Sequence, residues 1–361
     1  MIRFSVVVLV FCSLTVTACK HAVESPDSTL KDPRTYTWTI DTLFFARTPG
    51  DPGQILMGSM WGVNDTLVYT VGWDMWGGLA TMWKFQGKNW ERVKLSAFGN
   101  DGGPFNQQIT MFDVKGFDAN NIYAAGETTS YFTNPAVNTS FAIHFDGLQW
   151  RKIDMPQQAV QFTSIVLSSS SQVYFGADHG QLFFFDGLKW SVDTLKCSRY
   201  TTIPMYVSPV APSGDGGLYL KTAQYAEGIM PIMQYFIKYK NKQVTLIDSS
   251  AGRTPWGGYN FWQGDNGTVF SCGVGGIFCL SNNQWRNTYS AEVIFSIYGY
   301  NNEPVFATGI GGLYFNNGTS WELIYNVNDY RFLSGSRIWC TKNEVFLVYC
   351  DAVRSYVLNG K

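Results

Sequence analysis

Short runs of apolar residues separated by polar turns dominate the sequence, and residues 173–193 give the clearest example. Two runs there, 173–175 and 182–185, are rich in aromatic and branched side chains, which pack well on a pleated sheet surface. A polar turn separates the two runs, and Asp186-Gly187 follows the second. Gly and Asp tolerate turn conformations that other residues avoid, so a third strand is expected to begin near Trp190. The pattern predicts three antiparallel strands.

The same pattern recurs along the chain and predicts a repeat of four strands. Each repeat has three strand-like runs, followed by Asp/Asn-Gly-x-x-Trp or a close variant, whose Trp opens the fourth strand. The fourth-strand marker falls at Trp90, Trp150, Trp190, Val244, Trp285 and Trp321, with Val244 standing in a degenerate fourth repeat. The spacing falls around the roughly 40 to 50 residues expected of a propeller blade. The fixed place of the Trp predicts packing between neighbouring blades rather than sugar stacking.

The two ends of the chain complement each other. The seventh repeat reaches Asn359-Gly360 without a Trp strand, while residues 38–43 supply such a strand with no first, second or third strand before it. We therefore predict an all-β fold, a seven-bladed β-propeller of four-stranded antiparallel blades whose last blade is closed by the N-terminal strand. Closing the ring shields sheet edges that could pair with other chains. Residues 35–361 are expected to form this single domain.

The N-terminal segment has the features of an export signal. Residues 1–18 contain Arg3, an apolar run and then Val16-Thr17-Ala18 directly before Cys19. This ending resembles a bacterial lipobox, which implies that Cys19 is lipidated and that residues 19–34 form a lipidated flexible tether. An ordinary secretory signal or a membrane anchor is the alternative, although the apolar run is short for a transmembrane helix.

The repeat as a whole resembles a known group of propellers. A branched residue, Tyr or Phe, Gly, a short turn, a hydrophobic strand and Asp/Asn-Gly-x-x-Trp resemble the repeats of bacterial envelope lipoproteins, and are similar to kelch and BNR-type propellers. The Ser-x-Asp part of the Asp-box is absent. The resemblance implies a protein of the bacterial cell envelope, lipid-anchored to the outer membrane or cell surface. It leaves the activity open, because propellers host many functions.

The composition offers little chemistry. The formal net charge is -1 with no basic stripe, which argues against nucleic acid as a partner. The three histidines, His21, His144 and His179, form no cluster with metal-ligand spacing. The repeated Asp-Gly and Asn-Gly pairs are expected to form turns rather than calcium sites. We predict no catalytic residue, no metal and no cofactor.

Two cysteines flank a predicted hairpin centred on Gly275-Gly276. With a two-residue turn there, Cys272 would face Cys279, close enough for a disulfide. A disulfide and two free thiols remain the alternatives.

Loop length suggests where a ligand would bind. Connections from second to third strands and between blades emerge on one face of a propeller, and here they include every long loop. Six aromatic residues of these loops are the candidate ligand contacts: Trp73, Trp76, Tyr131, Phe132, Tyr225 and Trp256. The alternative is that they plug the central channel or cover blade ends.

The first functional hypothesis is a non-catalytic binding or scaffold module for a protein or glycan, which touches the membrane only through its N-terminal lipid. The alternative is a polysaccharide-active propeller hydrolase or lyase. A sialidase-like site would bring several arginines and an acid together over the channel, and Arg253, Arg331 and Arg337 are the arginines considered.

Overall fold

The structure is a computed structural model that describes most of the chain from residue 31 onward. The described residues are 31–43, 55–74, 81–93, 95, 107–130, 137–156, 161–169, 172–196, 205–225, 231–251, 254–301, 305–327, 335–350 and 354–361. The segment Lys31–Lys361 forms one compact unit. The predicted signal peptide and Cys19 lie outside the described residues. In this described part, no helix is long and apolar enough to cross a bilayer.

Strands make up nearly all regular structure, and the 3-10 helix η1 (Pro33–Thr35) precedes them. We number groups of four strands as units 1 to 7 in chain order, and β1 is counted with the last group. Unit 1 contains β2 (Ile55–Asn64), β3 (Leu67–Asp74), β4 (Thr81–Phe85) and β5 (Trp90–Arg92). Unit 2 contains β6 (Gln107–Asp118), β7 (Asn121–Ser130), β8 (Val137–Phe145) and β9 (Trp150–Ile153). Unit 3 contains β10 (Phe162–Ser169), β11 (Gln172–Ala177), β12 (Gln181–Phe185) and β13 (Trp190–Thr194). Unit 4 contains β14 (Met205–Pro212), β15 (Leu218–Tyr225), β16 (Pro231–Lys240) and β17 (Gln243–Ser250). Unit 5 contains β18 (Asn260–Gln263), β19 (Val269–Gly273), β20 (Gly276–Ser281) and β21 (Gln284–Tyr289). Unit 6 contains β22 (Ile294–Gly299), β23 (Val305–Gly309), β24 (Gly312–Asn316) and β25 (Trp321–Asn326). Unit 7 contains β26 (Arg337–Cys340), β27 (Val345–Cys350), β28 (Ser355–Gly360) and β1 (Trp38–Leu43).

Hydrogen bonding groups these strands into antiparallel sheets. Units 3 to 7 are each a four-stranded sheet, while units 1 and 2 belong to one eight-stranded sheet. The two halves of that sheet meet through one residue pair, Trp73 with Thr110. The ring therefore has six or seven blades, according to whether the eight-stranded sheet is counted once or twice. The predicted all-β class with four-stranded antiparallel sheets is confirmed.

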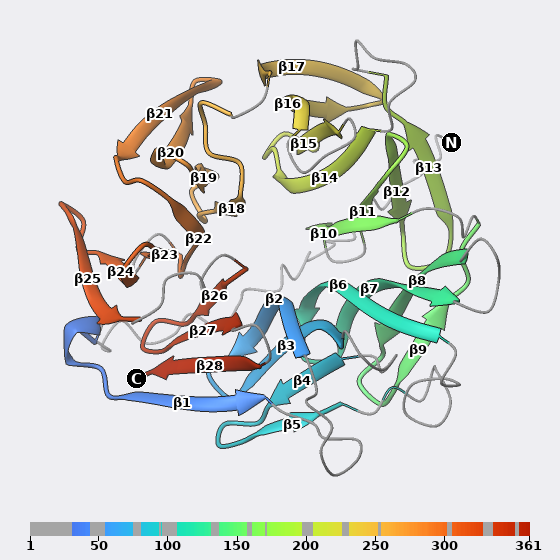
Figure 1. The fold of residues 1–361 in the computed structure, drawn as a ribbon. Helices are drawn as coiled ribbons and strands as arrows, with labels where there is room; N and C mark the ends of the chain where they lie inside the picture. Colours follow the sequence, from blue (N-terminus) through green and yellow to red (C-terminus); the bar gives the residue numbers. More distant parts are fainter. Residues whose placement is uncertain are drawn as a thin grey trace, which may run out of the picture. The chain divides into compact units, whose positions relative to one another are not determined.

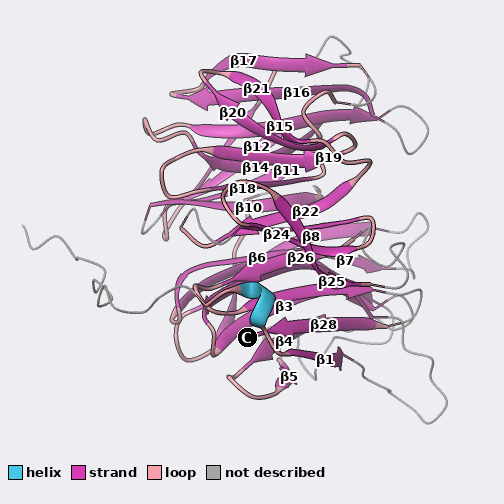
Figure 2. Cartoon of the chain, turned by 90° about the vertical axis from the view of Figure 1, so that its left-hand side faces the viewer, coloured by secondary structure: helices cyan, strands magenta, loops and turns pink. Residues whose placement is uncertain are grey.

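The units follow one another around a common centre, as Figure 1 shows in the colour order of the chain. Each first strand lies against the first strand of the next unit, from β2 through β6, β10, β14, β18 and β22 to β26, and β26 lies against β2 again. In the side view of Figure 2 the strands run between two faces, so their connections gather at opposite ends. A closed ring of small antiparallel sheets is the architecture of a β-propeller.

The prediction that the N-terminal strand completes the last sheet is confirmed. Strand β1 pairs antiparallel with β28, with Trp38 opposite Gly360 and Leu43 opposite Ser355. Thr37 and Lys361 extend the ladder, since each backbone N–H donates to the carbonyl of the other, at 2.8 and 3.2 Å. The first described strand thus supplies the outer edge of the last sheet.

Asp146-Gly147, Asp186-Gly187 and Asn317-Gly318 form the turns that the sequence predicts, whereas Asn359-Gly360 lies within strand β28 and pairs with β1. Asp186 Oδ1 accepts from the backbone N–H of Leu188 at 2.9 Å and of Lys189 at 2.7 Å, and Gly187 follows at φ 94°. Asp146 does the same for Leu148 and Gln149, and these hydrogen bonds lower its carboxyl pKa to about 2. The side chain closes the turn while glycine takes the left-handed conformation.

The core lies mainly between units, where the fourth-strand tryptophans pack. Trp150 of unit 2 meets Tyr69 of unit 1 with ring centroids 6.2 Å apart. Trp285 of unit 5 meets Phe236 of unit 4 at 4.9 Å. These contacts confirm that the repeated Trp packs one unit on the preceding one.

The predicted register of the cysteine hairpin is wrong. Cys272 lies opposite Ile277, and Cys279 lies opposite Phe270. The turn is displaced by one residue because Val274 leaves the hairpin and pairs with Val293. Both cysteines are free, so the structure agrees with the alternative of two thiols.

Candidate functional site

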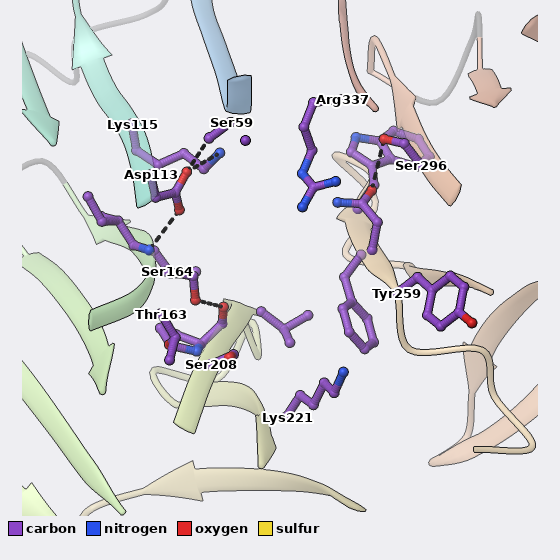
Figure 3. A pocket seen from close by; sticks show the side chains of 18 of the residues that line it. Ser59, Asp113, Lys115, Thr163, Ser164, Ser208, Lys221, Tyr259, Ser296 and Arg337 are labelled. Carbon is purple, nitrogen blue, oxygen red and sulfur yellow. Dashed lines mark hydrogen bonds and ion pairs between the residues drawn. The ribbon is translucent and has the colours of Figure 1, made fainter. Parts of the chain in front are cut away.

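The first strands of all seven units surround a central cavity of about 360 Å³ (Figure 3). Each unit contributes at least one polar side chain to its lining: Ser59, Asp113, Thr163, Ser208, Asn260, Ser296 and Arg337. Strand periodicity explains this placement, because successive side chains point to opposite faces. In β14, half-buried Tyr206, Ser208 and Val210 alternate with fully buried neighbours. One set of side chains therefore packs between units while the other faces the channel.

Asp113 on β6 ties three units together at the channel wall. Its Oδ1 accepts a short hydrogen bond from the Ser59 hydroxyl on β2 and lies 3.4 Å from Lys115 Nζ. Its Oδ2 accepts the backbone N–H of Ile165 on β10 at 2.8 Å. With Val114 N–H also donating at 2.9 Å, the carboxylate is well satisfied by protein groups. Its main role is therefore to fix the spacing of the first strands.

Asn260 on β18 plays a similar part on the other side of the ring. Its Oδ1 accepts the backbone N–H of Ile297 on β22 at 3.1 Å. On β10, the Ser164 hydroxyl donates to the Pro209 carbonyl of β14 at 3.2 Å. Side chains of one first strand thus bond the backbone of the next, and the channel wall is held in a fixed shape.

Lys221 on β15 points its ammonium into the cavity from unit 4 (Figure 3). Its Nζ donates to the Gly258 carbonyl at 2.6 Å. The side chain keeps accessible surface toward the cavity, yet it lies deep enough for desolvation to lower its pKa from 10.5 to about 8. Within the described residues, no carboxylate forms an ion pair with this ammonium.

Arg337 on β26 extends its guanidinium into the cavity from unit 7 (Figure 3). One terminal nitrogen donates to the Ser336 carbonyl at 2.8 Å. Burial lowers the arginine pKa, while the charge of Asp113 opposes that effect, and arginine stays protonated regardless. The cavity lining thus contains three cations, Lys115, Lys221 and Arg337, and one carboxylate, that of Asp113. The lining has a net charge of +2, although the overall charge of the chain is -1.

A second cavity of about 450 Å³ adjoins the first beside unit 4. The two cavities share Thr163, Ser208 and Lys221 as lining residues. Tyr206 and Tyr225 also line the second cavity, with their rings edge to face at 5.6 Å and an interplanar angle of 83°. Tyr206 lies near the start of β14 and Tyr225 ends β15, so this cavity lies at the end of unit 4 from which the long connections leave.

The structure brings one predicted contact to this site and places another in the core. Tyr225 is half-buried at the second cavity. Trp73 is half-buried at the end of β3, and its ring lies against Gly58 of the channel lining. Trp256 is 0% exposed and stacks on Trp285 at 5.9 Å, so it cannot touch a ligand. Trp256 therefore fits the structural alternative rather than the predicted contact.

The other predicted contacts, Trp76, Tyr131 and Phe132, lie outside the described residues. So do Arg253 and Arg331, which the enzyme hypothesis would bring together with Arg337 over the channel.

The histidines do not take part in this site. His144 on β8 stacks on Tyr123 with centroids 4.4 Å apart, and its Nε2 lies 2.8 Å from Asn121 Oδ1. Desolvation lowers its pKa, which keeps the ring neutral at pH 7. His179 occupies a turn at φ 54° and pairs with Asp178 at 3.0 Å.

The sequence did not single out Lys221, Asp113 or Tyr206 as site residues. One signal was present, since Lys221 is the one charged residue in the strand Leu218–Tyr225. A lone cation in such a run must face solvent, a cavity or a partner. Which of these it faces depends on the closure of the ring.

Comparison with known proteins supports the fold. The sequence matches no protein-family model and no curated protein. YCF48 from Cyanidioschyzon merolae has a similar structure, with a TM-score of 0.53, 11% identity, and coverage of 89% of this chain and 98% of that chain. A structure of YCF48 bound to D1 peptide gives a TM-score of 0.53, 13% identity, and coverage of 91% and 97%. Catalytically inactive virginiamycin B lyase from Staphylococcus aureus, determined with quinupristin, gives 0.54, 9% identity, and coverage of 89% and 99%. At these identities the likeness shows a shared β-propeller fold.

Proposed function

We propose that this protein is a seven-bladed β-propeller, lipid-anchored in the bacterial cell envelope, that acts as a non-catalytic binding or scaffold module. The count of seven is supported by the closed circuit of seven first strands and by the single residue pair that joins units 1 and 2. The proposed partner is a protein or glycan, and the binding surface is the face from which the long connections leave.

The observation that carries this proposal is the cavity at the Tyr206–Tyr225 pair. Aromatic rings with exposed edges offer large contact areas, and tyrosines are enriched at binding hot spots. Here the two rings border a cavity that continues into the polar channel through shared lining residues. The YCF48 structure bound to D1 peptide is one case in which this fold holds a peptide. A concave site with aromatic walls and a few polar groups is typical of ligand binding.

A glycan array together with capture from envelope extract would identify the ligand, and alanine variants would then test the site. Replacing both Tyr206 and Tyr225 by alanine should weaken binding at least tenfold, since each buried ring contributes on the order of 1.5–3 kcal/mol. Melting should change little, because both rings lie at a cavity edge. Leu188→Ala is the control, since this side chain is 90% exposed on the opposite face. Unchanged affinity in the double variant would refute the site, and a large loss of melting temperature would instead favour a structural role.

The alternative, a polysaccharide-active hydrolase or lyase, has one observation in its favour. A lysine whose pKa lies near 8 in a cavity has the protonation behaviour of a general base. Breakdown of an anionic polysaccharide by the purified protein, lost in Lys221→Met, would favour this alternative over the binding module.

The lipid anchor is a separate part of the proposal and rests on Val16-Thr17-Ala18 before Cys19. We expect Cys19→Ser to move the protein from the membrane to the soluble fraction, because the lipid supplies the apolar attachment. Fractionation of cells that express the two forms measures this. Equal membrane association of both forms would exclude Cys19 as the anchor.

A further inference from the structure

The central channel concentrates positive charge that the protein does not neutralise. Lys221 enters from unit 4 and Arg337 from unit 7, and both side chains point into one cavity (Figure 3). The carboxylate in the lining, Asp113, is already engaged by Ser59, Lys115 and Ile165. Burying a cation without a counterion is unfavourable, and a bound anion would supply the missing charge.

Both cations retain hydrogen-bond capacity toward the cavity. An ammonium has three N–H donors, and Lys221 directs one of them to the Gly258 carbonyl. A guanidinium has five, and Arg337 uses one terminal nitrogen for the carbonyls of Gly335 and Ser336. The hydroxyl of Ser208 lines the same space, whereas the hydroxyl of Thr163 donates to the Val207 carbonyl. These donor types match the acceptors of an oxyanion.

The size of the cavity admits a ligand group. A volume of about 360 Å³ exceeds by far the roughly 30 Å³ that one water occupies, and it lies at the lower end of the range for ligand pockets. The hydrogen bonds of Asp113 and Asn260 between first strands hold its wall in shape. A preformed site of this kind loses little freedom when it binds.

We infer that Lys221 and Arg337 form an anion-binding site inside the channel, which takes an oxyanion group of a ligand, either a carboxylate or a sulfate or phosphate ester. This inference goes beyond the proposed loop-face binding and does not depend on it, because simple anions can probe the channel without the natural partner.

The test measures binding of sulfate, phosphate and acetate to the purified protein by calorimetric titration. We expect saturable binding of at least one anion in the wild type. Lys221→Met and Arg337→Met should each weaken it roughly tenfold or more, because each removes one of the positive charges that line the channel. Lys221→Arg should retain most of the affinity, since the positive charge remains.

Lys84→Met is the matched control. Lys84 also lines a cavity, on the outer rim, where its ammonium lies 6.0 Å from the centroid of Tyr69. The control lowers the net charge of the protein by the same one unit as each channel variant. Nonspecific attraction of anions by the net charge is therefore matched between them. Far-UV circular dichroism and melting curves confirm that each variant is folded before its affinity is compared.

The pH dependence gives a second readout. Lys221 loses its proton as the pH rises through about 8, so sulfate, whose charge is constant in this range, should bind more weakly at about pH 9.5 than at about pH 7. The other titratable side chains that line the two cavities are Asp113, Lys115, Tyr206, Tyr225, Tyr259, Tyr298 and Arg337. In Lys221→Met this pH dependence should be reduced.

The anions separate the two sources of the ligand group. Preference for acetate would indicate a carboxylate, and preference for sulfate or phosphate would indicate an ester, and either result with loss in both channel variants supports the site. Absence of saturable binding for all three anions, or equal affinity in the channel variants and Lys84→Met, would overturn it. Neither of those results bears on the Tyr206–Tyr225 surface, which the alanine variants test separately.

Discussion

Several glycines of the first strands are required by the tryptophan ring of the preceding unit. The pairs are Gly116 with Trp61, Gly299 with Trp262, and Gly62 with Trp339. A Cβ atom at Gly116 would lie 2.3 Å from the ring of Trp61, far inside van der Waals contact. The backbone of Gly116 is not in the left-handed region, so the close approach of the ring explains the glycine. One methyl group at this position would force neighbouring first strands apart.

We therefore expect Gly116→Ala to lower the free energy of unfolding by about 1–3 kcal/mol, the usual range for overpacking a rigid core. Urea unfolding of the wild type and variant measures the difference. Gly335→Ala is the control, because a Cβ there meets nothing within 4 Å. If both variants lost the same small amount of stability, the ring of Trp61 would not restrict the space at Gly116.

Among the elements, those that depend on local sequence could be predicted. The turn at Asp186-Gly187 requires only that the carboxylate reach N–H groups two and three residues ahead. The strands on either side follow from the run of apolar residues, and the observed β12 (Gln181–Phe185) ends at Phe185 as the pattern indicates. The pairing of β1 with β28 could also be predicted, because each terminus of the sequence contains a part of one repeat.

The hairpin between β19 and β20 shows where local reasoning fails. A turn centred on Gly275-Gly276 is compatible with the sequence, but Val274 pairs with Val293 and the Gly275 N–H donates to the Glu292 carbonyl at 3.1 Å. These contacts with the next unit move the turn by one residue. When the turn moves by one residue, each cross-strand partner moves by two, so Cys272 faces Ile277 instead of Cys279.

The candidate site was harder still to predict, because its members meet only when the ring is closed. Lys221 lies on a second strand of unit 4 and Arg337 on the first strand of unit 7, with two further units between them along the chain. No spacing rule connects them. Trp256 shows the converse, since it lies in a connection between units, where aromatics suggest a binding surface, yet it fills the core between units 4 and 5.

At the scale of the whole molecule, ring closure depends on a few contacts of the N-terminal strand. Leu43 is 1% exposed, and Trp38 lies over Gly360 and 5.0 Å from the ring of Tyr325. The ladder from Trp38 to Leu43 also satisfies the outer edge of β28. An open edge would leave backbone donors and acceptors that can pair with another chain. Closure therefore contributes both stability and solubility.

Two truncations of the chain separate the predicted tether from the closing strand. Removal of residues 1–30 should leave the melting temperature nearly unchanged. The shortened chain keeps Pro33, the buried Tyr36 and the Arg34–Glu322 ion pair at 3.6 Å, so its contacts with the domain remain. Removal of residues 1–43 should lower the melting temperature by roughly 10 °C or more, because burial of Trp38 and Leu43 contributes on the order of 1.5–3 kcal/mol each and the ladder is lost as well. Since that variant could fail to fold, Leu43→Ala in the chain that begins at residue 31 gives a milder test. Its free energy of unfolding should fall by about 2–5 kcal/mol.

Light scattering should show association of the chain that lacks residues 1–43, because the exposed edge of β28 can pair with other copies. Equal melting temperatures for the two truncations would mean that the ring does not need β1 to close.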